Sequence, residues 1–332
     1  MAAKRNLESR ASRVTAACRG HTKRVVLIGA GSLAGAAAVA LAFGGLLSPA
    51  SSVASAAVGT FPGASSTGVP AGTVLKSVPG QVSSGTGWKF ISSSGGFVSV
   101  TGAGAVLSGL SIPYNVNVTA SNVTIKNDQI TTGGNYGISL RHTAGVTIEN
   151  STVSGANATS GRVQYAIDDL YQDSTGIVVN GNNVSDFCHG VQVSAGLVTG
   201  NYIHDPGYVA GDHIDGIFDP GSTGSLMISG NTILDNYTQT SAISLDASAA
   251  GKLVANKTVE NNLLGGGGYA IYGGTSLGNT TSNIVIKNNR FSQAFFPKSG
   301  EYGPIAYFNA KGTGNVWSGN VWDSTGQTIP SP

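Results

Sequence analysis

The sequence predicts an all-β solenoid, because short strand-like runs recur along most of the chain and no stretch has helical periodicity. One limb of the repeat places a polar residue two positions before an apolar one, after a short alternating run typical of a strand. Successive apolar members lie 19 to 31 residues apart, a spacing typical of solenoid coils. The pairs are Asp128/Ile130, Ser151/Val153, Asn182/Val184, Asn201/Ile203, Asn231/Ile233, Asn262/Leu264, Asn289/Phe291 and Asn320/Trp322.

A second limb lies between these pairs and joins a small residue to a β-branched one. Two limbs in each repeat indicate two or three short strands per coil. The members of this limb are Gly137-Ile138, Ala166-Ile167, Gly190-Val191, Gly216-Ile217, Ala242-Ile243, Ala270-Ile271 and Pro304-Ile305.

The column of Asn residues in the first limb has a physical reason. Asn tolerates the left-handed backbone of a tight corner, and Asn amides stacked on successive coils can hydrogen-bond to one another. The 49 glycines suit the remaining corners. We therefore expect an inward ladder of Asn side chains with Asn231 as one of its buried members.

The recurring limbs, V-x-I-x-N-N-x-[IVF] and [GA]-I, resemble the right-handed parallel β-helix repeats of the pectate-lyase-like superfamily. The resemblance covers roughly residues 88–325 and implies an all-β, right-handed, single-stranded parallel β-helix. That fold carries lyases, hydrolases, epimerases and non-enzymes, so the resemblance indicates a fold more strongly than an activity.

The first 56 residues have the order of a secretory signal peptide. Seven of the eighteen Lys and Arg residues precede the apolar run Val25–Leu47, and small residues then lead to a cleavage position after Ala56 or Ala57. An uncleaved membrane anchor is the alternative, because the apolar run is long. We expect 57–87 to be a flexible linker and the start of an N-terminal cap, 88–325 to be the β-helix, and 326–332 to be a C-terminal tail.

Cleavage of this leader changes the charge of the chain. It removes seven basic residues and one acidic residue, so the net charge of +2 becomes −4. A mildly acidic protein lacks the basic surface of a nucleic-acid binder. We therefore expect an extracellular monomer with no nucleic-acid partner and, after cleavage, no membrane contact.

Ionisable residues gather in the stretch 211–220, Gly-Asp-His-Ile-Asp-Gly-Ile-Phe-Asp-Pro, which holds three carboxylates and a histidine. When the second limbs are aligned as rungs of one parallel sheet, two columns of residues flank a groove. The first column reads Tyr136, Tyr165, His189, Asp215, Ser241, Tyr269, Gly303, and the second reads Ser139, Asp168, Gln192, Phe218, Ser244, Tyr272, Ala306. Tyrosines toward the ends and ionisable groups in the middle suit a polysaccharide substrate.

The two columns supply most of the candidate site. The candidate catalytic residues are Arg141, Asp168, His189, His213 and Asp215, and the candidate sugar-binding residues are Tyr136, Tyr165, Tyr269 and Tyr272.

Strand geometry places the two carboxylates of this set. Strict alternation would put Asp215 on the same side as the core residue Ile217, and a buried unpaired carboxylate is costly, so we expect Gly216 to bend the chain. Parity points Asp168 outward. Parallel rungs about 4.8 Å apart put the two backbones about 9.6 Å apart, with His189 on the rung between. That is near the upper end of the roughly 6.5–9.5 Å carboxyl spacing of inverting glycosidases.

Two chemistries are compatible with these residues. Polygalacturonases are similar in placing carboxylates and a histidine on neighbouring rungs, which implies hydrolysis. Their N-T-D, D-D, G-H-G and R-I-K motifs occur here only as the fragments Asp168-Asp169, Cys188-His189-Gly190 and Asp215-Gly216-Ile217.

Resemblance to β-helix lyases implies β-elimination from a uronic acid, with calcium (Ca2+) held by acidic residues and Lys or Arg as the base. Asp212, Asp215 and Asp219 are the candidate Ca2+ ligands, because carboxylates suit a hard cation. Between Lys126 and Lys252 the basic residues are Arg141 and Arg162.

Structural roles are the alternative for each of these residues. Asp205 and Asp219 precede prolines, as in ordinary turns, and Asp168 with Asp169 could form a solvated strand end. His189 could be a hydrogen-bonded rung residue, and the tyrosines could be wall residues. The concentration of rare charges favours a secreted polysaccharide-active enzyme, a lyase or glycoside hydrolase on an acidic polysaccharide. The rival is a non-catalytic β-helix that binds glycans or forms part of the cell surface.

Overall fold

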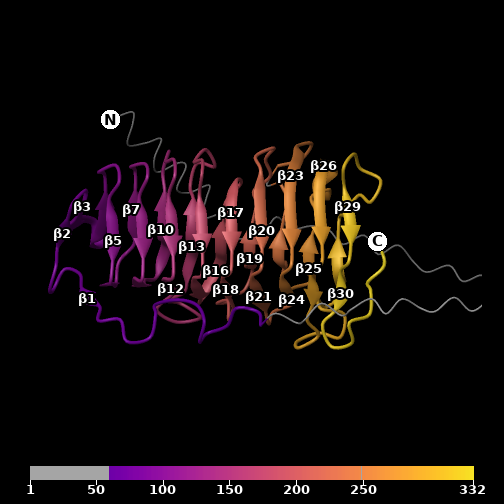
Figure 1. Cartoon of the computed structure of the whole chain (residues 1–332), viewed down its shortest axis with the longest axis horizontal. Coiled ribbons are helices and arrows are strands. Elements are labelled where there is room, and N and C mark those ends of the chain that lie inside the picture. Colours follow the sequence, from indigo (N-terminus) through magenta and orange to yellow (C-terminus); the bar gives the residue numbers. More distant parts are fainter. Residues whose placement is uncertain (1–59, 248) are drawn as a thin grey trace, which may run out of the picture. The chain divides into compact units, whose positions relative to one another are not determined.

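The computed structural model describes residues 60–247 and 249–332, and Phe61–Pro332 form one compact unit. The expected signal peptide, the alternative anchor and the first linker residues lie outside this described part. Within it, the helical elements are two short 3-10 turns, η1 (Ser93–Gly95) and η2 (Ser276–Gly278), and neither has the length to cross a bilayer. The remaining elements are strands, so the predicted all-β parallel β-helix is confirmed (Figure 1).

Each coil contributes one short strand to each of three sheets, which the chain visits in the order sheet 3, sheet 1, sheet 2. Sheet 1 contains β1 (Lys76–Ser77), β6 (Leu110–Ile112), β9 (Gln129–Thr131), β12 (Thr152–Ser154), β15 (Asn183–Ser185), β18 (Tyr202–Ile203), β21 (Thr232–Asp235), β24 (Leu263–Gly266), β27 (Arg290–Phe291) and β30 (Val321–Trp322). Sheet 2 contains β2 (Ser84–Gly85), β3 (Trp88–Ile91), β4 (Phe97–Val100), β7 (Val116–Val118), β10 (Gly134–Leu140), β13 (Val163–Asp169), β16 (Phe187–Gln192), β19 (Asp215–Phe218), β22 (Ser241–Ser244), β25 (Tyr269–Tyr272) and β28 (Gly303–Ala306). Sheet 3 contains β5 (Val106–Ser108), β8 (Thr124–Lys126), β11 (Thr147–Glu149), β14 (Val178–Asn180), β17 (Gly196–Thr199), β20 (Leu226–Ser229), β23 (Leu253–Glu260), β26 (Thr280–Lys287) and β29 (Val316–Ser318).

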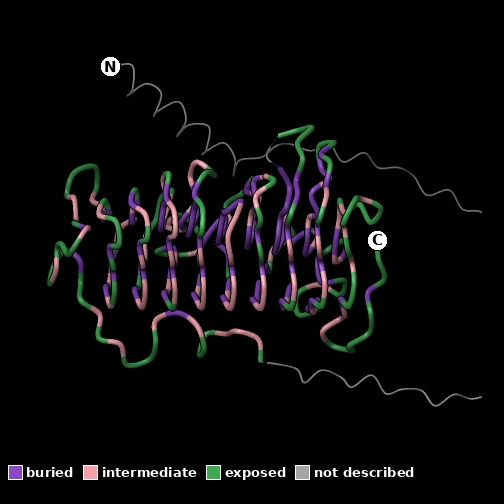
Figure 2. Tube along the Cα trace, turned by 45° about the horizontal axis from the view of Figure 1, so that its top comes forward, coloured by how far each residue is buried: buried purple, intermediate pink, exposed green. Residues whose placement is uncertain are grey.

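Strands of successive coils pair in parallel, except at the N-terminal end, where β3 pairs antiparallel with both β2 and β4. In sheet 2 the register aligns the small/β-branched limb as the repeat predicts. Ile138 pairs with Ile167, which pairs with Val191, and the column continues through Ile217, Ile243, Ile271 and Ile305. These aliphatic side chains and their equivalents in the other sheets fill the interior. Buried residues are coloured purple along the tube in Figure 2.

The Asn column forms a buried ladder, as expected. The backbone N–H and Nδ2 of Asn201 both donate to Oδ1 of Asn231, at 2.9 Å each. Asn231 donates in the same way to Asn262, at 2.9 and 3.0 Å. The ladder runs from Asn182 to Asn320, and its members are fully buried.

The left-handed corner belongs to the residue before each ladder member, which corrects the expectation that one Asn serves both roles. These preceding residues all have positive φ values, and each is Asn or Gly, the residues that adopt this conformation most readily. They are Asn127, Asn150, Gly181, Gly200, Gly230, Asn261, Asn288 and Gly319. The Asn-Asn dipeptide of the repeat therefore divides a corner and a ladder position between two residues.

Both ends of the described chain are attached to the coils. Near the N-terminal end, the backbone N–H of Gly68 donates to the carbonyl of Gly181 at 2.9 Å, and Val69 N–H donates to Thr152 Oγ1 at 3.3 Å. In the C-terminal tail, the side chain of Ile329 is buried and its carbonyl accepts a hydrogen bond from Trp317 Nε1 at 2.9 Å. The N-terminal segment thus crosses the outside of sheet 1, whereas the two columns of candidate site residues belong to sheet 2.

Candidate functional site

The two predicted columns share the outer face of sheet 2. Tyr136 pairs with Tyr165, Tyr165 with His189, and His189 with Asp215, as the aligned limbs predict. Aromatic rings of three of them stack along the sheet, with centroids 5.9 Å apart for Tyr136 and Tyr165 and 5.0 Å for Tyr165 and His189. Phe218 of the second column continues the stack, 5.2 Å from His189. A ring from each column in one stack means that both columns face the same side.

A bend at the small residue of each limb turns the first column outward. A Cβ added to Gly216 would lie 2.4 Å from Ile233 Cγ2, so this position faces the core. The next residue, Ile217, is also fully buried. Two consecutive inward positions break the strict alternation of a strand and leave Asp215 on the outer face, in agreement with the predicted bend.

Asp215 joins a histidine and a serine on neighbouring rungs. Its Oδ1 accepts a hydrogen bond from Ser241 Oγ at 2.7 Å, and its Oδ2 lies 3.3 Å from His189 Nδ1. The Nε2 atom of His189 is buried and has no hydrogen-bond partner among the described residues. All three side chains are almost fully buried. Neither ring nitrogen of His189 therefore makes a hydrogen bond to another described residue, although Nδ1 lies close to the Asp215 carboxylate.

Asp168 is a neutral carboxylic acid at neutral pH. Its side chain is fully buried, and this burial raises its pKa to about 8, with the neighbouring Asp169 adding to the rise. The Oδ1 atom accepts a hydrogen bond from Gln192 Nε2 at 2.7 Å, whereas Oδ2 has no hydrogen-bond partner among the described residues. The positive charge of Arg141 opposes the rise in the pKa of Asp168, so this guanidinium lies nearby. Arg141 is half-buried at the end of β10 and forms no ion pair with another described residue.

The register moves Asp168 and Asp215 farther apart than rung counting predicts. Asp168 aligns through Gln192 with Phe218, whereas Asp215 aligns with His189, three residues earlier along the strand. Three residues add about 10 Å along the strand to the about 9.6 Å across two rungs, so the backbones lie about 14 Å apart. The inferred spacing of about 9.6 Å is therefore wrong, because it left out the offset between the columns. The backbone spacing does not by itself support the carboxyl pair of an inverting glycosidase.

The three aspartates chosen as calcium ligands do not form a common site. Asp212 Oδ2 lies 2.6 Å from Arg162 Nη2, and Asp219 Oδ2 lies 3.1 Å from Lys257 Nζ, whereas Asp215 contacts His189. In the described part of the chain, no three His, Cys, Asp or Glu side chains are grouped so that they could hold a metal ion. Each of the three aspartates thus has its own side-chain partner, and they do not converge on one point.

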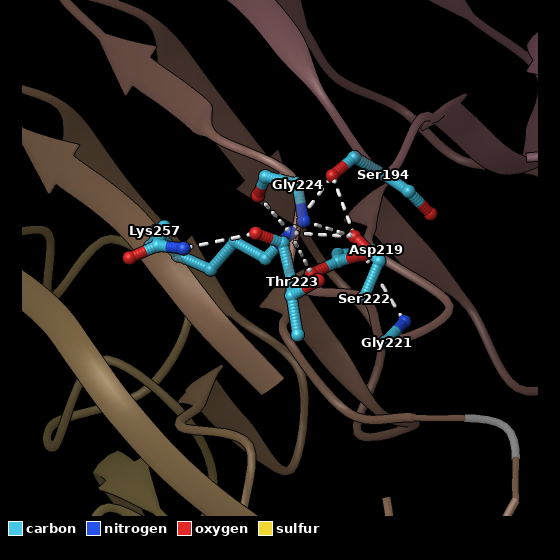
Figure 3. Close-up of polar contacts among 8 residues, drawn as sticks. Ser194, Asp219, Gly221, Ser222, Thr223, Gly224 and Lys257 are labelled. Atoms are coloured by element: carbon cyan, nitrogen blue, oxygen red, sulfur yellow. Dashed lines mark hydrogen bonds and ion pairs between the residues drawn. The ribbon is translucent and has the colours of Figure 1, made fainter. Parts of the chain in front are cut away.

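Lys257 is a fully buried cation that the sequence analysis missed. Its Nζ donates to the carbonyls of Ser194 and Gly224, both at 2.8 Å, and to Ser222 Oγ at 3.0 Å, in addition to its contact with Asp219 (Figure 3). Four acceptors around one nitrogen require an ammonium group. Burial lowers the pKa of Lys257 and raises that of Asp219 to about 6, and each charge opposes the shift of the other. The inward parity of Lys257 with Val259 in the run Leu253–Glu260 is the signal that could have identified it.

Asp235 is a second group that the sequence analysis missed. It ends β21 with inward parity, two residues after the core residue Ile233, and its Oδ1 accepts a hydrogen bond from the backbone N–H of Tyr237 at 2.9 Å. Burial raises the pKa of Asp235 well above its ordinary value, and the charge of Asp215 adds to the rise. A third carboxyl group, whose pKa is raised by burial, is thus close enough to Asp215 to sense its charge.

Loops between sheets 1 and 2 contact one another where the first column begins. The Arg162–Asp212 pair joins the loop before β13 to the loop before β19. The rings of Tyr208 and Tyr237, 5.1 Å apart, join the loop before β19 to the loop before β22. His213 lies in the loop before β19 and is half-buried. These contacts fix the loops beside the start of the site strands.

The candidate sugar-binding tyrosines differ in exposure. Tyr136, Tyr269 and Tyr272 are half-buried, whereas Tyr165 is 1% exposed and offers almost no surface to a bound chain.

Searches of protein-family models, of curated proteins and of solved structures each returned no match.

Proposed function

We propose that this protein is a polysaccharide-active enzyme that cleaves an acidic polysaccharide by β-elimination on the outer face of sheet 2. The observation that carries the proposal is the arrangement around His189: Nδ1 faces Asp215, Nε2 has no hydrogen bond among the described residues, and the neutral acid Asp168 lies on the adjoining rung. Groups whose environments separate their protonation states are typical of acid–base sites. Export through the leader and a monomeric state are part of the same proposal.

In this mechanism His189 is the general base. With the proton on Nδ1 directed at Asp215, the Nε2 lone pair removes the proton at C5 of a uronic acid residue. Asp168 and Arg141 receive the sugar carboxylate and reduce its negative charge, which makes the C5 proton more acidic. The electrons of the C5–H bond form the C4–C5 double bond, the C4–O bond breaks, and the departing oxygen takes up a proton from water, while His189 later releases the C5 proton to solvent.

Elimination is favoured over hydrolysis by the positions of the carboxyl groups. An inverting hydrolase holds its two carboxyl groups about 6.5–9.5 Å apart around a water molecule. Asp168 and Asp215 lie on backbones about 14 Å apart, with the ring of Tyr165 close enough to both that each charge raises its pKa. A histidine base and a neutral acid suit elimination without a second closely spaced carboxylate.

A non-catalytic glycan-binding protein is the second candidate, and burial favours it. Asp168, His189 and Asp215 are at most 2% exposed, so a substrate reaches them only after the covering side chains move. The buried polar atoms of His189 and Asp168 that have no hydrogen bond among the described residues keep the first candidate ahead.

The experiment uses the mature protein and a panel of uronic-acid polysaccharides. Absorbance at 235 nm reports the unsaturated product of a lyase, and new reducing ends without that absorbance report a hydrolase. For the proposed mechanism, His189→Ala and Asp168→Asn should each lower turnover by about 10²–10⁴-fold. If His189→Ala turned over a substrate at the wild-type rate, this site would not be the active site. Products without absorbance at 235 nm would show that the enzyme is a hydrolase and not a lyase. Binding without product on the whole panel would establish the second candidate.

A further inference from the structure

Four tyrosines form a connected patch at the C-terminal end of the outer face of sheet 2. Tyr269 and Tyr272 belong to β25, and Tyr302 and Tyr307 flank β28 on the next rung. Ring centroids are 5.8 Å apart for Tyr269 and Tyr302, 5.5 Å for Tyr272 and Tyr307, and 5.8 Å for Tyr269 and Tyr272. Unlike Tyr165, the two outer members are open to solvent, with Tyr302 61% and Tyr307 45% exposed.

The strand between the two outer tyrosines is almost bare on this face. Gly303 and Ala306 occupy the two column positions of β28, where earlier rungs carry His189 and Asp168 or their neighbours. A Cβ at Gly303 would lie 3.3 Å from the Tyr269 ring, closer than most real contacts, so any side chain there would press on this ring. At these two positions, therefore, no large side chain lies between the two exposed rings.

Tyr307 adopts a backbone conformation that is unfavourable for a bulky residue. Its φ is 56°, in the left-handed region, and its carbonyl accepts a hydrogen bond from Thr275 Oγ1 at 2.6 Å. This conformation holds the exposed ring against Tyr272. Glycine would fit the corner without strain, so the tyrosine at this position is better explained by its ring than by the needs of the turn.

We propose that this tyrosine patch, Tyr269, Tyr272, Tyr302 and Tyr307, is a binding platform for the polysaccharide, separate from the acid–base group. The inference rests on the proposed function, because it gives the same chain a second place to bind. Tyrosine joins an apolar ring face to a polar hydroxyl, which matches the mixed C–H and O–H faces of a sugar.

The position of the tyrosine patch also favours a polysaccharide as its ligand. Tyr269 and Tyr272 stand in the two columns that carry His189 and Asp168, so a chain lying along the outer face of sheet 2 would meet both sites. Tyr302 and Tyr307 are five residues apart, about 16 Å along the strand, which is longer than one sugar ring.

The test measures binding and cleavage separately. Affinity electrophoresis through gels that contain polygalacturonate, alginate or xylan should retard the wild-type protein in at least one gel. The double variant Tyr302→Ala/Tyr307→Ala should bind that polysaccharide at least tenfold more weakly. Tyr302→Phe/Tyr307→Phe retains both rings and should bind within a few-fold of the wild type. Tyr202→Ala, which removes a half-buried tyrosine on sheet 1, is the matched control and should leave binding unchanged.

The outcomes separate this inference from the proposed function. Wild-type binding by a folded Tyr302→Ala/Tyr307→Ala protein overturns the platform, even if the enzyme cleaves its substrate. Ring-dependent binding without any product supports the platform and overturns the proposed elimination. Absence of both binding and cleavage for the wild type on all three polysaccharides overturns both. If the alanine variant does not fold, loss of binding by single Tyr302→Ala, which lies outside the strained corner, decides the question.

Discussion

Replacing Asn231 by Leu tests whether the buried amide ladder holds the coils together. Leucine has the same branched arrangement of heavy atoms and is somewhat larger, so the substitution removes hydrogen bonds without emptying the position. Asn231 accepts two hydrogen bonds from Asn201 and donates to Asn262 Oδ1 at 3.0 Å and Val198 O at 2.9 Å. Each of these partners is buried inside the coil and has no access to water.

The expected loss follows from which partners keep another bond. Asn201 Nδ2 still donates to Val179 O, and Asn262 Oδ1 still accepts from the backbone N–H at position 231. The backbone N–H of Asn201 loses its acceptor. A buried N–H group without an acceptor lowers the free energy of unfolding by about 1–3 kcal/mol, and the hydrogen bonds lost by Asn201 Nδ2 and Asn262 Oδ1 add about 1 kcal/mol. We expect the free energy of unfolding to fall by about 2–4 kcal/mol.

Urea unfolding followed by circular dichroism measures this change. With an m-value of about 3 kcal/mol/M, the midpoint should fall by about 1 M. The control is Asn117→Leu on the outer face of sheet 2, where the amide is half-buried and accepts one hydrogen bond from Asn115. Its midpoint should change by less than a quarter of that amount. Equal midpoints for wild type and Asn231→Leu would refute the ladder as a source of stability.

Three further predictions follow from the buried charges. Lys257→Met should lower the free energy of unfolding by about 3–5 kcal/mol, because it leaves the Asp219 carboxylate buried without its cation; adding Asp219→Asn should recover part of this loss in the same urea assay. Burial raises the pKa of Asp168 from 3.8 to about 8, so its contribution to stability is complete below pH 3.8 and is lost by the time the pH has risen through about 8. Between about pH 4 and 8 the free energy of unfolding of Asp168→Asn should therefore fall less than that of the wild type, and an equal fall would contradict the buried acid. Asp215→Asn should abolish turnover while keeping the Ser241 hydrogen bond and the fold, whereas Asp323→Asn at the last coil should leave turnover unchanged; wild-type rates for Asp215→Asn would remove it from the site.

Most of the fold could be predicted from the repeat in the sequence, because each limb has the same structural role in its coil. Small residues before Ile or Val gave the register of sheet 2, and the polar column gave the ladder, including the burial of Asn231. The division of the corner between two residues was missed, because Gly200 and Gly230 replace the first Asn in their coils. The packing of Gly68 on sheet 1 was also missed, since a Gly-rich, Ser-rich composition describes a flexible linker and a docked segment equally well.

The candidate site was less predictable, because it depends on contacts between loops of unequal length. Column alignment correctly placed His189 beside Asp215, but nothing in the repeat indicated that Arg162 would pair with Asp212. Asp219 shares the inward parity of Ile217, and that parity alone could have predicted a buried carboxylate rather than a calcium ligand.

Two sets of buried polar groups differ in how far they are satisfied, and the difference is one physical reason to expect chemistry on sheet 2. Lys257 and Asp219 satisfy each other inside the coil, as a structural ion pair must. His189 and Asp168 are equally buried, yet Nε2 of the one and Oδ2 of the other have no hydrogen bond among the described residues. Stability alone would favour apolar side chains at these two positions, because each unsatisfied atom costs free energy on folding. Polar atoms that local packing does not require are typical of functional sites. Their position on one face, which also carries the half-buried tyrosines of the same columns, favours a ligand of that face as the missing partner.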